Sequence, residues 1–233
     1  MKLRVFFLFS CTLLLLSSCK KTTHVSLVEN ETHGTLTYHL QDDDGKGIPA
    51  VKVYLYDTEA FYQWGERSDK TYVDTMRTNQ QGSVYFKDLN PRNYFVVADS
   101  VSLNGLRYRT EEYVQVVAGI EKEKSVKISD FAGTLRLKLI SHYDYFTALR
   151  GLGVIAYPSN TAVQSDNVRT VIANAKLKGV TDAQGIVSIK VPSNVNYDFI
   201  VYSLTSNNLG YGYGSFSVRK GELNNIELYT HPM

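Results

Sequence analysis

One stretch of the chain concentrates aromatic side chains within an otherwise polar segment. Phe61, Tyr62 and Trp64, the only tryptophan in 233 residues, stand within four positions of one another. Flat aromatic rings can stack against the C–H face of a sugar, and polar neighbours such as Gln63 and Glu66 can bond its hydroxyls. The same rings could instead cap the open end of a β-sandwich. The sequence therefore leaves a glycan-binding role and a structural role open for this segment.

A second stretch, residues 207–216, alternates glycine with tyrosine. On a β-strand Tyr211 and Tyr213 share one face and the glycines share the other, which predicts a shallow strip for another backbone. A protein-docking or strand-accepting surface is one interpretation. An ordinary ladder of tyrosines over a tightly packed sheet is the other.

The remaining reactive side chains do not form a recognisable catalytic or metal-binding pattern. The acidic turn Asp42-Asp43-Asp44-Gly45 resembles the start of a calcium loop but lacks a glutamate at the twelfth position, which favours a polar hairpin. No G-x-S-x-G motif is present. We therefore predict a protein that is not an enzyme and that has no catalytic residues, no metal site and no cofactor. The histidines are scattered, without ligand spacing, at His24, His33, His39, His142 and His231.

The two cysteines lie near the N-terminus, and the second follows a signal-like segment. A basic start with Lys2 and Arg4 precedes an apolar run over residues 5–16, which is too short to span a bilayer as a mature helix. The sequence Leu16-Ser17-Ser18-Cys19 that follows closely resembles a bacterial lipobox. This resemblance implies cleavage before Cys19, a diacylglycerol and a palmitate on that residue, and a membrane as partner through the lipid anchor. Cys11 would leave with the signal peptide, so no thiol would remain for a disulfide or for catalysis.

The charge balance argues against a nucleic-acid partner. The formal net charge is +2, and removal of Lys2 and Arg4 would bring the mature chain close to zero. Binding to phosphates requires a concentrated basic face. We therefore expect no nucleic-acid partner, and a glycan or a protein of the envelope remains the candidate partner.

The sequence pattern predicts that the mature chain contains two copies of one β-rich unit. Residues 34–40 and 133–139 both begin with glycine and alternate apolar with polar positions, as a strand with one buried face does. Val51 and Val154 are assigned as matching core positions of the next strand. A repeat of about 100 residues is the size of a complete β-sandwich and too long for a solenoid unit.

Turns and tyrosines repeat in the same order. Asn79 and Asp182 each stand three residues before a glycine, Gly82 and Gly185, which is typical of a type I turn followed by a left-handed residue. In both copies a tyrosine opens a strand twelve residues after that glycine. We therefore predict an all-β protein, with a signal peptide at 1–18, a lipidated tether at 19–33, and sandwiches at 34–130 and 131–233.

These elements resemble the prealbumin-like, Ig-like sandwiches of carboxypeptidase regulatory-like domains and of the B-type repeats of collagen adhesins. The pattern departs at Arg92, where the family usually has glycine. Adhesin repeats often carry an isopeptide bond that needs an acidic residue, and this chain has Ala98 and Val201 at those positions. Lys138 and Asn225 are therefore not expected to be linked.

Taken together, the resemblances imply a Bacteroidota-type outer-membrane lipoprotein. The dipeptide Lys20-Lys21 after the cysteine, in place of an acidic run, favours the periplasmic face over the cell surface. We expect a surface for binding or assembly, with glycan as the candidate ligand at Phe61, Tyr62 and Trp64. The alternative is a fimbrial or adhesin-like subunit that docks protein through an edge strand.

Overall fold

The computed structural model describes residues 32–64, 71–206 and 208–232. The predicted signal peptide, the lipidation site at Cys19 and residues 20–31 of the predicted tether lie outside the described residues. Among the residues that the structure does describe, no helix is both long enough and apolar enough to cross a membrane.

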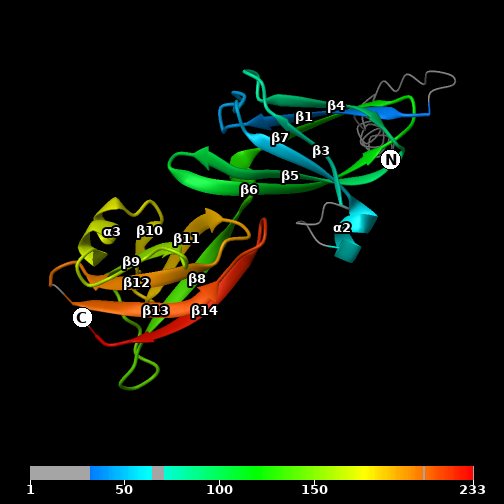
Figure 1. The fold of residues 1–233 in the computed structure, drawn as a ribbon. Helices are drawn as coiled ribbons and strands as arrows, with labels where there is room; N and C mark the ends of the chain where they lie inside the picture. The colour runs from blue at the N-terminus through cyan, green and yellow to red at the C-terminus, as the bar shows by residue number, and fades with distance from the viewer. Residues whose placement is uncertain (1–31, 65–70, 207, 233) are drawn as a thin grey trace, which may run out of the picture.

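The first half of the described chain forms two sheets that face each other (Figure 1). One has the strand order β4-β1-β7, and the other has the order β3-β2-β5-β6. The central strand β1 pairs antiparallel with β4 and parallel with β7. The strands are β1 (Gly34–Gln41), β2 (Lys52–Asp57), β3 (Tyr72–Arg77), β4 (Ser83–Leu89), β5 (Arg92–Leu103), β6 (Leu106–Val116) and β7 (Glu121–Lys127).

The second half repeats this arrangement strand for strand. Its sheets have the orders β11-β8-β14 and β10-β9-β12-β13, so each strand has its counterpart seven numbers earlier. The strands are β8 (Ala132–Ser141), β9 (Leu152–Pro158), β10 (Lys178–Val180), β11 (Ile186–Pro192), β12 (Tyr197–Ser203), β13 (Leu209–Phe216) and β14 (Leu223–Thr230). The predicted all-β fold with two consecutive β-sandwiches is confirmed.

Three short helices complete the described chain. The helices α2 (Thr58–Trp64) and α3 (Val168–Asn174) lie in corresponding connections, after β2 and after β9. The 3-10 helix η2 (Ile128–Asp130) joins β7 to β8, the last strand of one sandwich to the first of the next.

Alternation along the central strands builds the two cores. Leu36, Tyr38 and Leu40 of β1 are fully buried in the first core, and the side chains between them are half-buried. Leu135, Leu137 and Leu139 of β8 are fully buried in the second core. Burial of such side chains stabilises the fold by about 1.5 to 3 kcal/mol each.

A buried threonine fixes how the two copies correspond. The hydroxyl of Thr78 accepts from the amide of Val51 at 2.9 Å, and that of Thr181 accepts from the amide of Leu152 at 3.0 Å. The counterpart of Val51 is therefore Leu152. The predicted match of Val51 with Val154 was wrong by two residues. Because the side-chain period of a strand is two, that shift keeps the same face and is invisible to the alternation pattern.

The predicted turns are confirmed. The side chain of Asn79 accepts from two backbone amides at 2.9 and 3.0 Å, and that of Asp182 does so at 2.9 and 2.8 Å. Gly82 and Gly185 both have φ of 73°. A Cβ on Gly82 would lie 2.4 Å from the carbonyl oxygen of Leu40, so no other residue fits this position.

The two repeated tyrosines close the same corner in each sandwich, although only Tyr197 opens its strand as predicted, since β5 already begins at Arg92. Tyr94 and Tyr197 are both buried, and their hydroxyls donate to the carbonyls of Asn90 at 2.9 Å and Pro192 at 3.2 Å. Burial raises the pKa of both phenols, so the hydroxyls keep their protons. The repeated tyrosine is therefore a structural residue.

Candidate functional site

Helix α2 begins at Thr58, directly after Asp57, the last residue of β2. The carboxylate of Asp57 accepts from the amide of Ala60 at 3.0 Å and forms an ion pair with Arg92 of β5. Burial opposes the charge of Asp57, but the amide and the guanidinium outweigh it and lower its pKa. A charged cap at the first turn stabilises a helix N-terminus, so this short helix starts at a fixed point beside β5.

The structure separates the three predicted aromatic residues. Phe61 faces the sheet, and its ring lies 5.5 Å from that of Tyr56 and 4.8 Å from that of Phe95. Tyr62 and Trp64 face solvent and are 74% and 51% exposed. The two expected roles are thus divided, with Phe61 covering the sheet and the other two presented outward.

Phe61 and Tyr62 join a larger set of rings on the outer face of the β3-β2-β5-β6 sheet. Tyr54 and Tyr56 of β2 lie 6.0 Å apart, and the ring of Phe95 on β5 lies 4.7 Å from that of Tyr113 on β6. Tyr72 of β3 lies 6.2 Å from Tyr56. We call this set the aromatic platform: Tyr54, Tyr56, Phe61, Tyr62, Trp64, Tyr72, Phe95 and Tyr113.

A hydrogen bond between two phenols ties the helix to the edge of the sheet. The hydroxyls of Tyr62 and Tyr113 are 2.9 Å apart, although both rings are more than half exposed. This hydrogen bond, together with burial, raises the pKa of Tyr113 to about 12. The pair holds the Tyr62 ring in place before any ligand arrives, which reduces the entropy lost on binding.

In the second sandwich, helix α3 covers the corresponding outer face of the sheet. Its outer residues Ile155 and Ile200 are fully buried, and α3 packs on them through the buried Val168. Helix α2, in the corresponding connection of the first sandwich, has no buried residue. In the first sandwich Tyr56, Phe95 and Val97 are likewise buried on this face, and Phe61 of α2 packs against them. The platform rings that stay exposed are those of Tyr62, Trp64, Tyr72 and Tyr113.

The chemistry of the platform suits a ligand with both apolar and hydroxyl groups. Ring faces offer contact to C–H groups, while the phenols of Tyr62, Tyr72 and Tyr113 are able to donate and accept hydrogen bonds. The ammonium of Lys52 lies 4.6 Å above the ring of Tyr54, so a cation stands at the edge of the platform.

Sequence reasoning found the helix residues but not the strand residues of the platform. Tyr54 and Tyr56 alternate with the buried Val53 and Leu55, so β2 is apolar on both faces. That double pattern was the available signal, because a strand with water on one face would alternate with polar residues.

The other predicted site lies on β13, at the edge of its sheet. Among the described strands β13 is hydrogen-bonded to β12 alone, and Tyr211 is 43% exposed. The backbone of Tyr213 belongs to β13, and its side chain lies outside the described residues. The expected glycine strip was wrong at Gly212, whose Cα faces Leu228 and Phe199 inside the chain's own sandwich.

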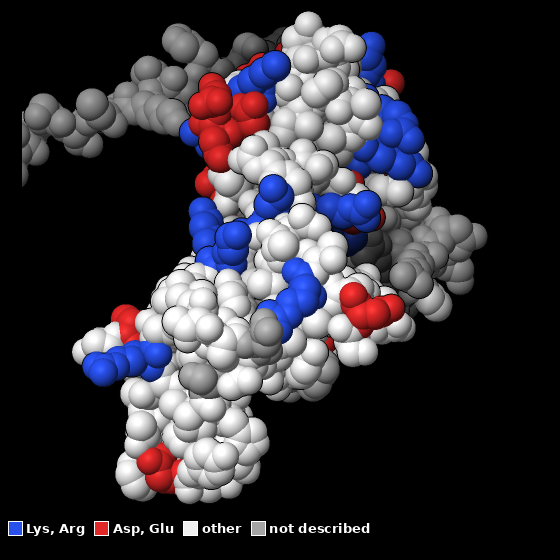
Figure 2. Space-filling model, turned by 90° about the vertical axis from the view of Figure 1, so that its left-hand side faces the viewer, with Lys and Arg blue, Asp and Glu red and all other residues white. Residues whose placement is uncertain are grey.

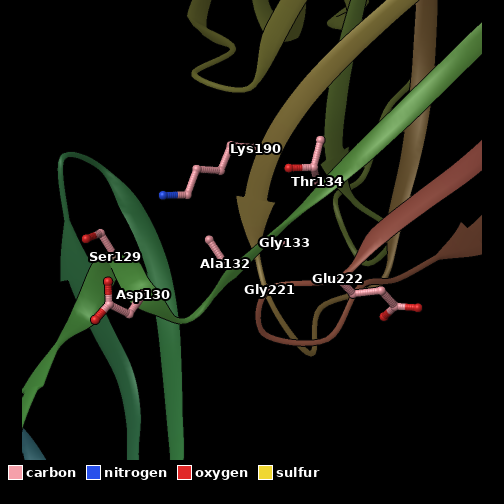
Figure 3. Close-up of a pocket in the computed structure, with 8 residues that line it drawn as sticks. All are labelled: Ser129, Asp130, Ala132, Gly133, Thr134, Lys190, Gly221 and Glu222. Carbon is pink, nitrogen blue, oxygen red and sulfur yellow. The ribbon is translucent and has the colours of Figure 1, made fainter. Parts of the chain in front are cut away.

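A polar pocket of about 270 Å³ lies where the two sandwiches meet (Figure 3). It is formed by η2, the ends of β8 and β11, and the turn before β14. Lys190 points toward Ser129 across the pocket, whereas Glu222 points away. The hydroxyl of Ser129 is hydrogen-bonded to Asp43, and no histidine is among the residues that line the pocket.

The acidic turn adopts the hairpin geometry. Asp42 accepts from the amides of Asp44 at 3.0 Å and Lys46 at 2.8 Å, and Gly45 has φ of 79°. Within the part of the chain that the structure describes, no three His, Cys, Asp or Glu side chains gather as metal ligands would. The ammonium of Lys138 lies 3.6 Å from the carboxylate of Glu227.

Surface charge is dispersed on the face drawn in Figure 2. Lys and Arg side chains form separate patches that uncharged and acidic residues interrupt, without one continuous basic field. This distribution agrees with the low net charge of the sequence.

Comparison with known proteins adds a likeness of fold. No protein-family model and no curated protein matches the sequence. Among solved structures, the Bacillus anthracis TIE protein has a TM-score of 0.38 at 14% identity, with 85% of this chain and 34% of that chain covered. GBS52, the minor pilin of Streptococcus agalactiae, has a TM-score of 0.38 at 17% identity, with coverage of 86% and 96%.

A streptococcal ancillary pilin has a TM-score of 0.35 at 13% identity, with coverage of 84% and 63%. This chain therefore spans about a third of the TIE protein and somewhat less than two thirds of the ancillary pilin. At these identities no function is carried across.

Proposed function

We propose that the chain is a non-enzymatic lipoprotein of the cell envelope that binds a neutral glycan on the aromatic platform. Lipid on Cys19 would anchor it to the outer membrane of a Bacteroidota-type bacterium, and Lys20-Lys21 favours the periplasmic face. The observation that carries the proposal is the contrast between the two sandwiches. Helix α3 packs Val168, Val171 and Ile172 on its sheet, whereas α2, in the corresponding connection, packs Phe61 on its sheet and leaves the rings of Tyr62 and Trp64 exposed.

The experiment is affinity electrophoresis of the full chain through gels that contain a β-glucan, an α-glucan, a mannan or a xylan. We expect retardation by at least one polysaccharide. Trp64→Ala and Tyr62→Ala should each weaken it strongly, while the melting temperature moves by less than about 2 °C, because both side chains are exposed.

Tyr85→Ala is the matched control, since Tyr85 is an exposed tyrosine on β4, in the opposite sheet of the same sandwich. Its retardation should equal that of the wild type. Undiminished retardation of the Trp64 and Tyr62 variants would refute the platform as the binding site. A loss of more than about 5 °C in melting temperature would instead assign those residues to the stability of the fold.

The second candidate function is assembly through a strand edge, in the manner of a fimbrial or adhesin-like subunit. The observation that favours it is the unpaired side of β13 among the described strands, next to the exposed Tyr211. An open edge presents backbone donors and acceptors to which another chain can add a strand.

A further inference from the structure

A second group of exposed rings lies on the other sandwich. It is formed by the connection between β8 and β9 and by the end of β14. Tyr143 and Phe146 are 74% and 79% exposed, and Tyr145 and Tyr229 are also exposed. We call this set the tip cluster: His142, Tyr143, Tyr145, Phe146, Tyr229 and His231.

The rings of the tip cluster form a continuous row. The ring of Tyr143 lies 5.3 Å from His231, which lies 5.2 Å from His142. His142 lies 5.3 Å from Tyr145, which lies 5.6 Å from Tyr229. Segments about ninety residues apart in the sequence thus build one surface.

The loop that carries the row is held by its own hydrogen bonds. Asp144 accepts from the amides of Phe146 at 3.1 Å and Thr147 at 2.9 Å, and from the hydroxyl of Thr147. The amide of Tyr145 donates to the carbonyl of Ser141 at 2.9 Å. The exposed rings are therefore presented from an ordered turn, which lowers the entropic cost of binding.

The first sandwich again provides an internal comparison. The corresponding connection, between β1 and β2, is the polar turn that begins at Asp42. Isolated bridges close the two connections in the same way, Gln41 with Gly47 and Ile140 with Ala148. The fold therefore does not require aromatic residues at this turn, and Tyr145 even adopts φ of 62°, a conformation that is costly for an aromatic residue.

The chemistry of the cluster favours a neutral hydroxylated ligand. The row consists of phenols and imidazoles rather than aliphatic groups, and no described residue hydrogen-bonds the imidazoles of His142 or His231. The one carboxylate of the loop, on Asp144, is occupied by Thr147. Phosphate, sulfate or an anionic membrane would require a cluster of cations, and the six side chains include no lysine or arginine.

The location also argues against the membrane. In Figure 1 the loop after β8 lies at the end of the second sandwich, whereas β1, the first described strand, lies in the first sandwich. A chain anchored through its N-terminal segment would hold this loop away from the bilayer.

We propose that the tip cluster is a second saccharide-binding site. The proposal rests on the proposed function, because it places two contacts of one chain on the same neutral polysaccharide. Two linked contacts bind a polymer more tightly than either alone by a factor of about 10² to 10⁴ when the polymer reaches both. An oligosaccharide that is too short to span both sites gains nothing from the second contact.

The test uses the full chain with two double variants, Tyr143→Ala/Phe146→Ala at the tip and Tyr62→Ala/Trp64→Ala on the platform. Each is measured against a polysaccharide that retards the wild type and against a tetrasaccharide of the same sugar, by affinity electrophoresis and calorimetry. The tip variant is expected to lose at least tenfold in affinity for the polysaccharide. Its affinity for the tetrasaccharide, which binds at the platform, should not change. The platform variant should still bind the polysaccharide weakly through the tip cluster. The variant that combines all four substitutions should not bind it.

Polysaccharide affinity of the tip variant equal to that of the wild type would overturn the second site and leave the platform standing. If that variant instead loses self-association measured by light scattering, the cluster docks protein. Polysaccharide and tetrasaccharide affinities of the platform variant equal to those of the wild type, with loss only in the tip variant, would refute the platform and support the tip. Tyr85→Ala serves as the matched control for removing an exposed aromatic side chain.

Discussion

At the scale of single residues, two neighbouring side chains of α2 have different roles in the platform. Phe61 is held between Tyr56 and Phe95, while Tyr62 turns outward and is fixed by its phenol partner Tyr113. Aromatic contacts of this kind add about 0.5 to 1.5 kcal/mol each beyond the area they bury. Phe61 therefore anchors α2, and Tyr62 owes its orientation to a single hydrogen bond.

That hydrogen bond makes a measurable prediction. In Tyr62→Phe the pKa of Tyr113 should fall from about 12 toward the ordinary value of 10.0, because the partner that favours its neutral form is gone. The raised pKa means that the pairing is intact below pH 10 and is lost as the pH rises toward 12. NMR titration of ring-labelled tyrosine would follow it, with Tyr143→Phe as a control that should leave Tyr113 unmoved. An unchanged Tyr113 titration in Tyr62→Phe would contradict the paired geometry.

At the scale of elements, the corresponding helices α2 and α3 differ in what they leave exposed. Helix α3 buries Val168 against β9 and β12, whereas α2 packs Phe61 on the buried Tyr56 and Phe95 and leaves Tyr62 and Trp64 exposed. The edge strand β13 carries the exposed Tyr211, as its counterpart β6 carries the exposed Tyr113. Covered faces stabilise the fold, and open faces and edges are available to partners.

The assembly candidate is tested at this strand. If β13 accepts a strand, the wild type should form multimers whose mass grows with concentration, and Tyr211→Lys should remain monomeric, because an edge lysine opposes strand addition. Light scattering after size exclusion measures both. Tyr85→Lys, on the edge strand β4, is the matched control and should assemble as the wild type does. A wild type that stays monomeric at every concentration would exclude assembly through β13 by the chain alone.

At the scale of the whole molecule, one carboxylate connects the two sandwiches. Glu112 of β6 lies 3.2 Å from the ammonium of Lys124 on β7 and accepts from Lys220 of the second sandwich at 2.8 Å. The ammonium of Lys220 also lies 3.9 Å from the ring centroid of Phe131, beside η2. Burial opposes the charge of Glu112, but the hydrogen bonds from Lys220 and Lys124 outweigh it, so its pKa lies below the ordinary 4.5.

This junction predicts a pH dependence of stability. Because the folded-state pKa of Glu112 is lowered, its contribution is complete above pH 4.5 and is lost as the pH falls through the folded value. Glu112→Gln should reduce the free energy of unfolding by about 1 to 2 kcal/mol at neutral pH. Its difference from the wild type should vanish in acid, as measured by urea unfolding at a series of pH values. Glu123→Gln, an exposed change on β7, should have little effect at any pH, and a Glu112→Gln deficit that persists in acid would contradict this role.

The sequence by itself determined the elements and their repetition. Alternation placed Leu36 and Leu135 inside, and the spacing from Asn79 to Gly82 defined a turn, because these signals depend on neighbours in the chain. Phe61, Tyr62 and Trp64 were found as a group because they are adjacent. Their opposite orientations were not predictable, since they depend on where α2 meets β5.

Only the tertiary structure decided which surfaces exist. The aromatic platform unites β2, β3, β5, β6 and α2, and the tip cluster unites the β8–β9 connection with the end of β14. Strand register and sheet order bring these rings together from distant parts of the chain. The outer tyrosines of β2 follow the same period of two as its core residues, so only the packing of α2 shows which rings stay open to solvent.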